Sequence, residues 1–279
     1  GAGNDVEISG ASIDLAGARV TAGEGSISLQ ARAGGIDDSQ GEGLLAANQL
    51  SLDSAAGIGE TNFINTNVTS VNAVAADGIR ISEANALSVN ASAGGDVELR
   101  TLNGSMTIGA LETTAGDVTI NVNGAGNGVT IHSLDAGDGE LRVTTASGSI
   151  SGPGNISAGT AVLDAGNASI ILGNDPASVI NFGSIDARGG SVEINEDSAM
   201  HITRLVADAA ILRAQGDITD AADAQITVSG SAVFEADGGD IILGDSATDQ
   251  FDVGTLGLRS GNAMVIADGA LNLDGVDVA

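Results

Sequence analysis

A pair of short alternating strands recurs about every 21 residues in this chain of 279 residues, and it limits the possible folds more than any other feature. Two interleaved series of aliphatic positions run through the middle of the chain, with steps of 20 to 23 residues. Self-similarity at such a spacing is typical of solenoids, in which each repeat packs on its neighbours. The series are Val97, Val118, Leu141 and Val162, and Met106, Val129, Ile150, Ile170 and Val192.

Each predicted strand alternates aliphatic with polar residues, as in Asp96-Val97-Glu98-Leu99-Arg100. Successive side chains of a strand point to opposite faces, so Val97 and Leu99 are expected to point inward and their neighbours to face water. Glycine followed by Asp, Ser or Asn precedes many of these strands, where it can adopt turn conformations that other residues avoid. No stretch longer than about a dozen residues sustains the apolar spacing of a helix.

These patterns predict an all-β protein with the fold of a parallel β-helix, or β-solenoid, of about 21 residues per winding and about 13 windings. Parallel crossovers prefer one hand, so a right-handed coil is expected. A β-sandwich also uses short alternating strands, but it requires tight antiparallel hairpins and no regular unit of this length. Aromatic residues make up only 1% of the chain, so Val, Ile, Leu and Ala must fill the core.

The spacing is less even outside the middle of the chain, although strands are still visible there. The stretch 55–78 is richer in Asn and Thr, and we interpret it as windings with polar columns rather than as a loop. The further strands are expected at Ile27–Leu29, Ile79–Ile81, Ile241–Leu243 and Leu271–Leu273.

No shift in composition marks a linker, so residues 1–279 are expected to form one continuous domain. The chain opens at Gly1 without methionine or a signal peptide, and a leader or a longer preceding sequence is expected to have been removed. The ends, at Asp5–Ile8 and Val276–Val278, follow the repeat and lack a cap. Uncapped ends expose backbone donors and acceptors, so the expected partners are further windings of a longer chain or other copies of the protein.

The chain is strongly acidic, with 37 acidic residues, nine basic ones and a formal net charge of −28. All the basic residues are arginine. Such a field repels phosphate backbones and anionic lipids, and no apolar run is long enough to cross a bilayer. We therefore expect neither nucleic acid nor a membrane as a partner. Cysteine is absent, so disulfides do not stabilise the fold.

Few residues resemble a catalytic centre. Hydrolases with a β-helical fold cleave acidic polysaccharides with clustered aspartates, a histidine and a basic residue. Here Asp37 and Asp38 form an isolated pair, and His132 and His201 lie alone at positions expected to face outward. Pectate lyases use calcium and usually a lysine, which this chain lacks. We therefore expect no catalytic residue and no enzymatic activity.

Metal binding has a weak basis in two acidic stretches, 135-DAGDGE-140 and 237-DGGD-240. Their oxygens could hold calcium, but they lack the repeated Gly-Gly-x-Gly-x-Asp of calcium-binding β-rolls. We interpret them as acidic corners and expect no cofactor and no metal ligand, with calcium as the one open alternative. The stretch 61-TNFINTNVTS-70 carries too few threonines in one rank for an ice-binding face, and turn chemistry explains it better.

Two units, 155-NISAGTAVLDAGNASIILGN-174 and 236-ADGGDIILGD-245, resemble the repeats of filamentous-haemagglutinin-like exoproteins, bacterial adhesins exported by two-partner secretion. The resemblance covers most of the chain at the level of pattern. It implies an extracellular or cell-surface β-helical shaft that displays adhesive or toxic tips, with glycans or receptors of other cells as partners. The Asn-Pro-Asn motifs of the family's secretion domain do not occur here, so the chain would be an interior segment of the shaft.

Two alternatives to a shaft remain from the sequence. The chain could be a subunit of an extracellular filament or sheath whose copies stack end to end, since a solenoid can continue across such a junction by strand addition. It could also be a β-helical enzyme that acts on polysaccharide, for which the isolated Asp37 and Asp38 give little support.

Overall fold

The computed structural model describes residues 4–278, and every regular element in this range is a β-strand. Residues 1–3 and 279 lie outside the described residues, and with them Gly1, on which the expectation of a removed leader depends. The chain divides into two compact units, unit 1 with residues 1–142 and unit 2 with residues 143–279. The single domain over residues 1–279 stays a prediction.

Short strands joined by corners make up unit 1, and several strands of unit 2 are longer. The strands of unit 1 are β1 (Val6–Gly10), β2 (Ile13–Asp14), β3 (Arg19–Thr21), β4 (Ser26–Ala31), β5 (Ile36–Asp37), β6 (Leu44–Ala46), β7 (Gln49–Ser54), β8 (Ile64–Asn67), β9 (Ser70–Ala75), β10 (Ile79–Glu83), β11 (Leu87–Ala93), β12 (Val97–Thr101), β13 (Met106–Thr113), β14 (Val118–Val122), β15 (Val129–Ile131) and β16 (Ser133–Asp135). The division between the units falls within β17 (Glu140–Thr145). The strands of unit 2 are β18 (Ile150–Gly152), β19 (Asn155–Ala158), β20 (Thr160–Asp164), β21 (Ser169–Leu172), β22 (Ile180–Phe182), β23 (Ile185–Glu196), β24 (Met200–Ala214), β25 (Ile218–Ala236), β26 (Ile241–Leu243), β27 (Gln250–Ser260), β28 (Ala263–Val265) and β29 (Leu273–Val278).

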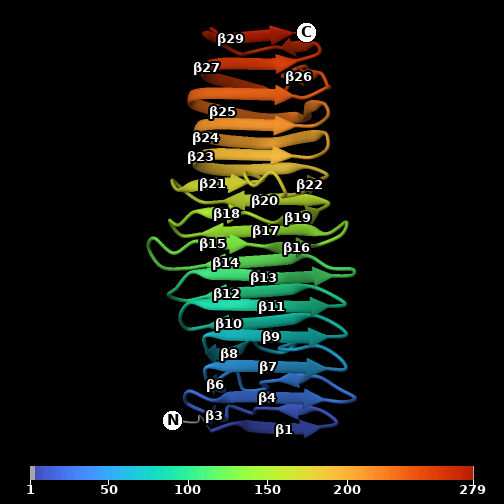
Figure 1. The fold of residues 1–279 in the computed structure, drawn as a ribbon, viewed down its shortest axis with the longest axis vertical. Helices are drawn as coiled ribbons and strands as arrows, with labels where there is room; N and C mark the ends of the chain where they lie inside the picture. The colour runs from blue at the N-terminus through green and yellow to red at the C-terminus, as the bar shows by residue number, and fades with distance from the viewer. Residues whose placement is uncertain (1–3, 279) are drawn as a thin grey trace. The chain divides into compact units, whose positions relative to one another are not determined.

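Each unit is a parallel β-solenoid. In unit 1 the strands β4, β7, β9, β11 and β13 lie one above another (Figure 1), and each pairs in parallel with the next. In unit 2 the strands β23, β24, β25 and β27 stack in the same way. The windings number about 13 and average about 21 residues. The predicted all-β parallel fold is therefore confirmed, and its right-handedness stays a prediction.

Columns of aliphatic side chains form the core of each unit. The register places Ile81, Leu99 and Ile120 in one column of unit 1, and none of the three is exposed. Ile170 and Val192 stack in the same manner in unit 2. Each buried side chain of this size stabilises the folded chain by about 2 kcal/mol relative to exposure. Because the columns cross from winding to winding, each winding depends on its neighbours for a covered core.

Two details of the predicted strands are wrong. Val162 was predicted to point inward and does not, and the strand predicted at Leu271–Leu273 begins two residues later. Ala161 and Leu163 point into the core and Val162 is half-exposed, because the pairing of β20 with β23 selects that phase. The sequence Ala-Val-Leu offers an aliphatic residue in either phase, so local alternation could not decide between them. The last strand begins at Leu273, whose side chain is exposed.

The stretch 55–78 belongs to the windings, as predicted, and contributes β8 and β9. Its polar residues stack across windings: the amide nitrogen Nδ2 of Asn90 donates to Oδ1 of Asn72 over 2.9 Å. Thr66 is buried, whereas Thr61 and Thr69 are exposed, so these threonines do not share one face. The interpretation as polar columns is confirmed.

Corners combine close backbone contacts with buried hydroxyl groups. A Cβ added at Gly94 would lie 1.8 Å from the carbonyl oxygen of Ala76, so glycine is required there by close approach of two windings. The hydroxyl of Thr101, at the end of β12, donates to the carbonyl oxygen of Gly104 over 2.6 Å. These contacts satisfy backbone groups where the chain leaves a strand. The described residues 4–278 contain no helix long and apolar enough to cross a membrane.

Candidate functional site

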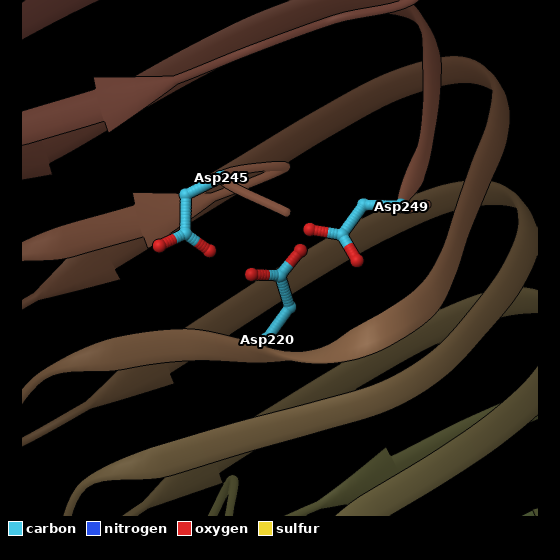
Figure 2. Close-up of side chains that lie close together, drawn as sticks. All are labelled: Asp220, Asp245 and Asp249. Atoms are coloured by element: carbon cyan, nitrogen blue, oxygen red, sulfur yellow. The ribbon is translucent and has the colours of Figure 1, made fainter. Parts of the chain in front are cut away.

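Three aspartates of unit 2 form the one group of potential metal-ligating side chains found among residues 4–278. Asp220 lies in β25, Asp245 follows β26, and Asp249 precedes β27. One carboxylate oxygen of each lies within 4.8 Å of the other two. Figure 2 shows the three carboxylates converging from separate segments of the chain.

Backbone amides already satisfy part of this aspartate group. The amide of Gly244 donates to Asp220 Oδ2 over 2.8 Å, and the amide of Ser246 donates to Asp249 Oδ2 over 2.7 Å. The amide of Ala224 donates to Asp249 Oδ1 over 3.2 Å. Asp249 therefore caps the turn between β26 and β27 and links it to the preceding winding.

The other oxygen of Asp220, Oδ1, is buried and has no hydrogen-bond partner among the described residues. Burial raises the pKa of Asp220, the neighbouring charges of Asp249 and Asp245 raise it further, and the amide of Gly244 opposes them. Carboxylate oxygens are the ligands that calcium prefers, and a divalent cation would relieve the repulsion between them. The hydrogen bonds, however, assign two of the three aspartates a structural role in the corner.

This group has no recognisable signal in the sequence. Asp245 and Asp249 lie within one turn, but Asp220 comes a full winding earlier and joins them only through the register of the strands. The spacing of Asp245 and Asp249 alone is common in turns, where carboxylates accept hydrogen bonds from backbone amides.

The isolated pair Asp37–Asp38 lies in unit 1, and both carboxylates are held by backbone amides. Asp38 is fully buried, with Oδ1 accepting from Gly17 N over 2.8 Å and Oδ2 accepting from Gly43 N over 2.6 Å. Asp37 Oδ1 accepts from Thr61 N over 3.1 Å. Both residues therefore connect corners of adjacent windings, which is a structural role.

The two histidines lie in different units. His132, between β15 and β16 of unit 1, is exposed, as expected for an outward position. His201 in β24 of unit 2 is half-buried, and its Nδ1 lies 3.0 Å from the hydroxyl of Thr219 on the next winding. The absence of catalytic residues and of enzymatic activity stays a prediction.

The two acidic stretches lie at corners, as predicted, and neither contributes to the aspartate group. Asp135 Oδ1 accepts from the amide of Gly137 over 2.9 Å, and Glu140 pairs with Arg142 over 2.8 Å. Asp240 Oδ1 accepts from the amide of Asn262 over 2.8 Å. These bonds give Asp135, Glu140 and Asp240 partners without a metal, and calcium binding by the chain stays untested.

Taken together, strands, columns and corners define a β-helical repeat protein. The chain is similar over residues 115–179 and 189–257, just under half of its length, to a family described as "Repeats of unknown function (DUF5649)". No curated protein and no solved structure matches the chain. The similarity and the fold support the β-helical part of the resemblance to haemagglutinin-like exoproteins.

Proposed function

We propose that this chain is a structural shaft segment of a large bacterial adhesin, exposed on the cell surface or secreted. The observation that carries the proposal is the in-register stacking of aliphatic columns within each unit, as at Ile81, Leu99 and Ile120. A winding that covers the core of its neighbour allows such a shaft to be lengthened repeat by repeat without a change of fold.

The outward face supports the same role, because its charges bind windings to one another. Arg213 lies between two acidic residues of adjacent strands, with Nη1 3.1 Å from Glu193 and Nε 2.7 Å from Glu235. Acidic residues far outnumber the basic ones, 37 against nine, so the net charge is −28. A charged, strand-rich surface resists lateral aggregation, which a long exposed β-structure must avoid.

Surface location is tested on intact cells that produce the protein. Protease added to these cells is expected to remove the chain, with a cytoplasmic protein as the control for lysis. A chain that is protected until the cells are opened would contradict an extracellular role.

The shaft role is tested by binding. The purified chain is expected to show no saturable binding to glycan arrays or to host cells, because the proposal places adhesive sites elsewhere in the parent protein. Saturable binding that is unaffected by salt would make this chain an adhesive region itself and would contradict a passive shaft.

Self-assembly into a filament is the second candidate, favoured by the exposed aliphatic residues of the outermost strands. Leu273, Val276 and Val278 in β29 are 63%, 51% and 48% exposed, and Ile8 in β1 is 38% exposed. A strand of another copy could cover them and pair with the edge of β29.

Sedimentation and electron microscopy at increasing protein concentration separate the two candidates. Fibres that Val276→Asp abolishes and that Val74→Asp leaves unchanged would favour assembly through the outermost strand, since Val74 is as exposed but lies in β9. A chain that remains monomeric at high concentration supports the shaft segment instead.

A further inference from the structure

Two buried glutamates lie at the ends of strands, one in each unit. Glu83 is the last residue of β10 in unit 1 and Glu196 is the last residue of β23 in unit 2. Their exposed fractions are 0% and 3%. A carboxylate in such a place is costly unless hydrogen-bond donors replace the water it has lost.

Glu83 has donors at both carboxylate oxygens. Oε2 accepts from the hydroxyl of Thr66 over 2.7 Å and from the amide of Val68 over 3.0 Å, and Oε1 accepts from the amide of Asn85 over 3.0 Å. The amide of Ala84 donates to the carbonyl oxygen of Thr66 over 3.0 Å, which fixes the register between the two windings.

Glu196 occupies the same arrangement in unit 2 but has donors at only one oxygen. The amide of Asp197 donates to the carbonyl oxygen of Ile180 over 3.0 Å, so Ile180 stands where Thr66 stands in unit 1. Oε1 accepts from the amide of Phe182 over 2.8 Å and from the hydroxyl of Ser198 over 3.2 Å. Oε2 is buried without a hydrogen-bond partner among the described residues.

Two donors differ between the corners: the hydroxyl of Thr66, and the amide of Asn85, which in unit 1 bonds the second carboxylate oxygen. Thr66 supplies a hydroxyl to Glu83, whereas Ile180 has no donor to offer Glu196. Burial raises the pKa of Glu196 to about 7, the charge of Asp197 adds to the effect, and the amide of Phe182 and the hydroxyl of Ser198 oppose it.

The charges around Glu196 do not offset its burial. Its register neighbour on the next winding is Ala214, which brings no charge. A hollow of about 200 Å³ beside it is lined in part by charged residues, and one of its two arginines, Arg213, is already bound to Glu193 and Glu235. The charged residues that line the hollow besides Glu196 are Arg213, Glu235, Asp237 and Arg259.

We propose that Glu196 is a proton-dependent latch between two adjacent windings of unit 2. Protonated Glu196 stays buried and accepts the hydrogen bonds of Phe182 and Ser198, which ties the end of β23 to β22. Ionised Glu196 leaves the corner for solvent, and the amide of Phe182 loses its acceptor.

The sign of the effect follows from the raised pKa. Between the ordinary value of 4.5 and the folded value of about 7, the folded corner holds its proton while an open corner releases it. Opening therefore becomes about tenfold more favourable per pH unit in this range, and the effect levels off above about pH 7.

Hydrogen exchange on the whole chain tests the latch. After correction for intrinsic exchange, the protection of the Phe182 and Asp197 amides is expected to fall by at least tenfold between about pH 5 and pH 8. The amides of Val68 and Ala84, which occupy the same places around Glu83, serve as the internal control and are expected to change much less. Equal behaviour of the two corners would overturn the proposal.

Two substitutions make the test reciprocal. Ile180→Thr places a hydroxyl where Thr66 has one, and it is expected to reduce the pH dependence of the protection of the Phe182 amide. Thr66→Val removes that hydroxyl in unit 1, and it is expected to make the protection of the Val68 amide depend on pH. Carboxyl carbon resonances read the protonation of Glu196 directly, with a midpoint near 7 in the unaltered chain that Ile180→Thr lowers. A Glu196 midpoint close to that of exposed glutamates would also overturn the proposal, even if a variant fails to fold.

Discussion

The stacked columns can be tested with two leucines that differ in burial and lie three positions apart. Leu99 in β12 is fully buried between Ile81 and Ile120, whereas Leu102, just past the end of the strand, is 54% exposed. Leu99→Ala and Leu102→Ala remove the same atoms from the same part of unit 1. Any difference in stability between the variants therefore reports on the column.

The expected cost differs several-fold between the two variants. Truncation of a buried leucine to alanine costs about 2 to 5 kcal/mol, depending on how far the surroundings collapse into the cavity. The windings above and below Leu99 are fixed by parallel ladders, so little collapse is possible and a loss of about 3 to 4 kcal/mol is expected. Leu102→Ala is expected to cost less than about 1 kcal/mol.

Urea unfolding followed by far-ultraviolet circular dichroism measures the loss, since the chain has no Trp or Tyr for fluorescence. Solenoids can unfold in segments, so the comparison requires that both variants keep the slope of the unaltered protein. Equal shifts for the two variants, or a loss below about 1 kcal/mol for Leu99→Ala, would refute the column as the source of stability.

Three further changes test the corners. Gly94→Ala is expected to lower the melting temperature by several degrees, because the added methyl would lie 1.8 Å from a carbonyl oxygen. Gly269→Ala is the control, since a Cβ there meets nothing within 4 Å, and it is expected to leave the melting temperature unchanged. Thr101→Val removes the hydrogen bond to Gly104 and is expected to lower the free energy of unfolding, measured with urea, by about 1 kcal/mol. An unchanged free energy of unfolding would show that the hydroxyl is dispensable. Because the pKa of Asp220 is raised, stability falls as its carboxyl ionises, so Asp220→Asn is expected to raise the melting temperature near pH 8 but not near pH 4, and a gain at both would contradict this cause. Calcium that stabilises the unaltered chain but not Asp220→Asn would show that the aspartate group binds a cation.

The fold was predictable because its signals are local and repeated. Val97 and Val118 lie 21 positions apart, share an alternating pattern, and are direct partners in the structure. The phase at Val162 was not predictable, since its neighbours Ala161 and Leu163 are also apolar. There the choice depends on what the next winding presents, which a single strand does not contain.

The hydrogen bonds of the acidic residues at the corners were mostly not predictable from the sequence. Asp37 and Asp38 form an isolated acid pair in the sequence, yet backbone amides, including those of Gly17 and Thr61 on neighbouring windings, hold both. The burial of Glu83 did have a signal: Ile79 and Ile81 point inward, and strict alternation carries the next inward position to Glu83. Its partners come from another winding, and only the register reveals them.

A repeat fold also limits how far the change at one corner can spread. The column next to Glu196 runs through the aliphatic residues Ile194 and Leu212, which are buried and pair in register. Stability in a solenoid is a sum over windings and their interfaces, so opening at one corner weakens one interface and leaves distant ones unchanged. Ile180, at the place that Thr66 has in unit 1, thus contributes to a pH response at one interface while the shared scaffold stays the same. Loosening that extended over all of unit 2 above pH 7 would contradict this independence and would require a cooperative unit larger than a pair of windings.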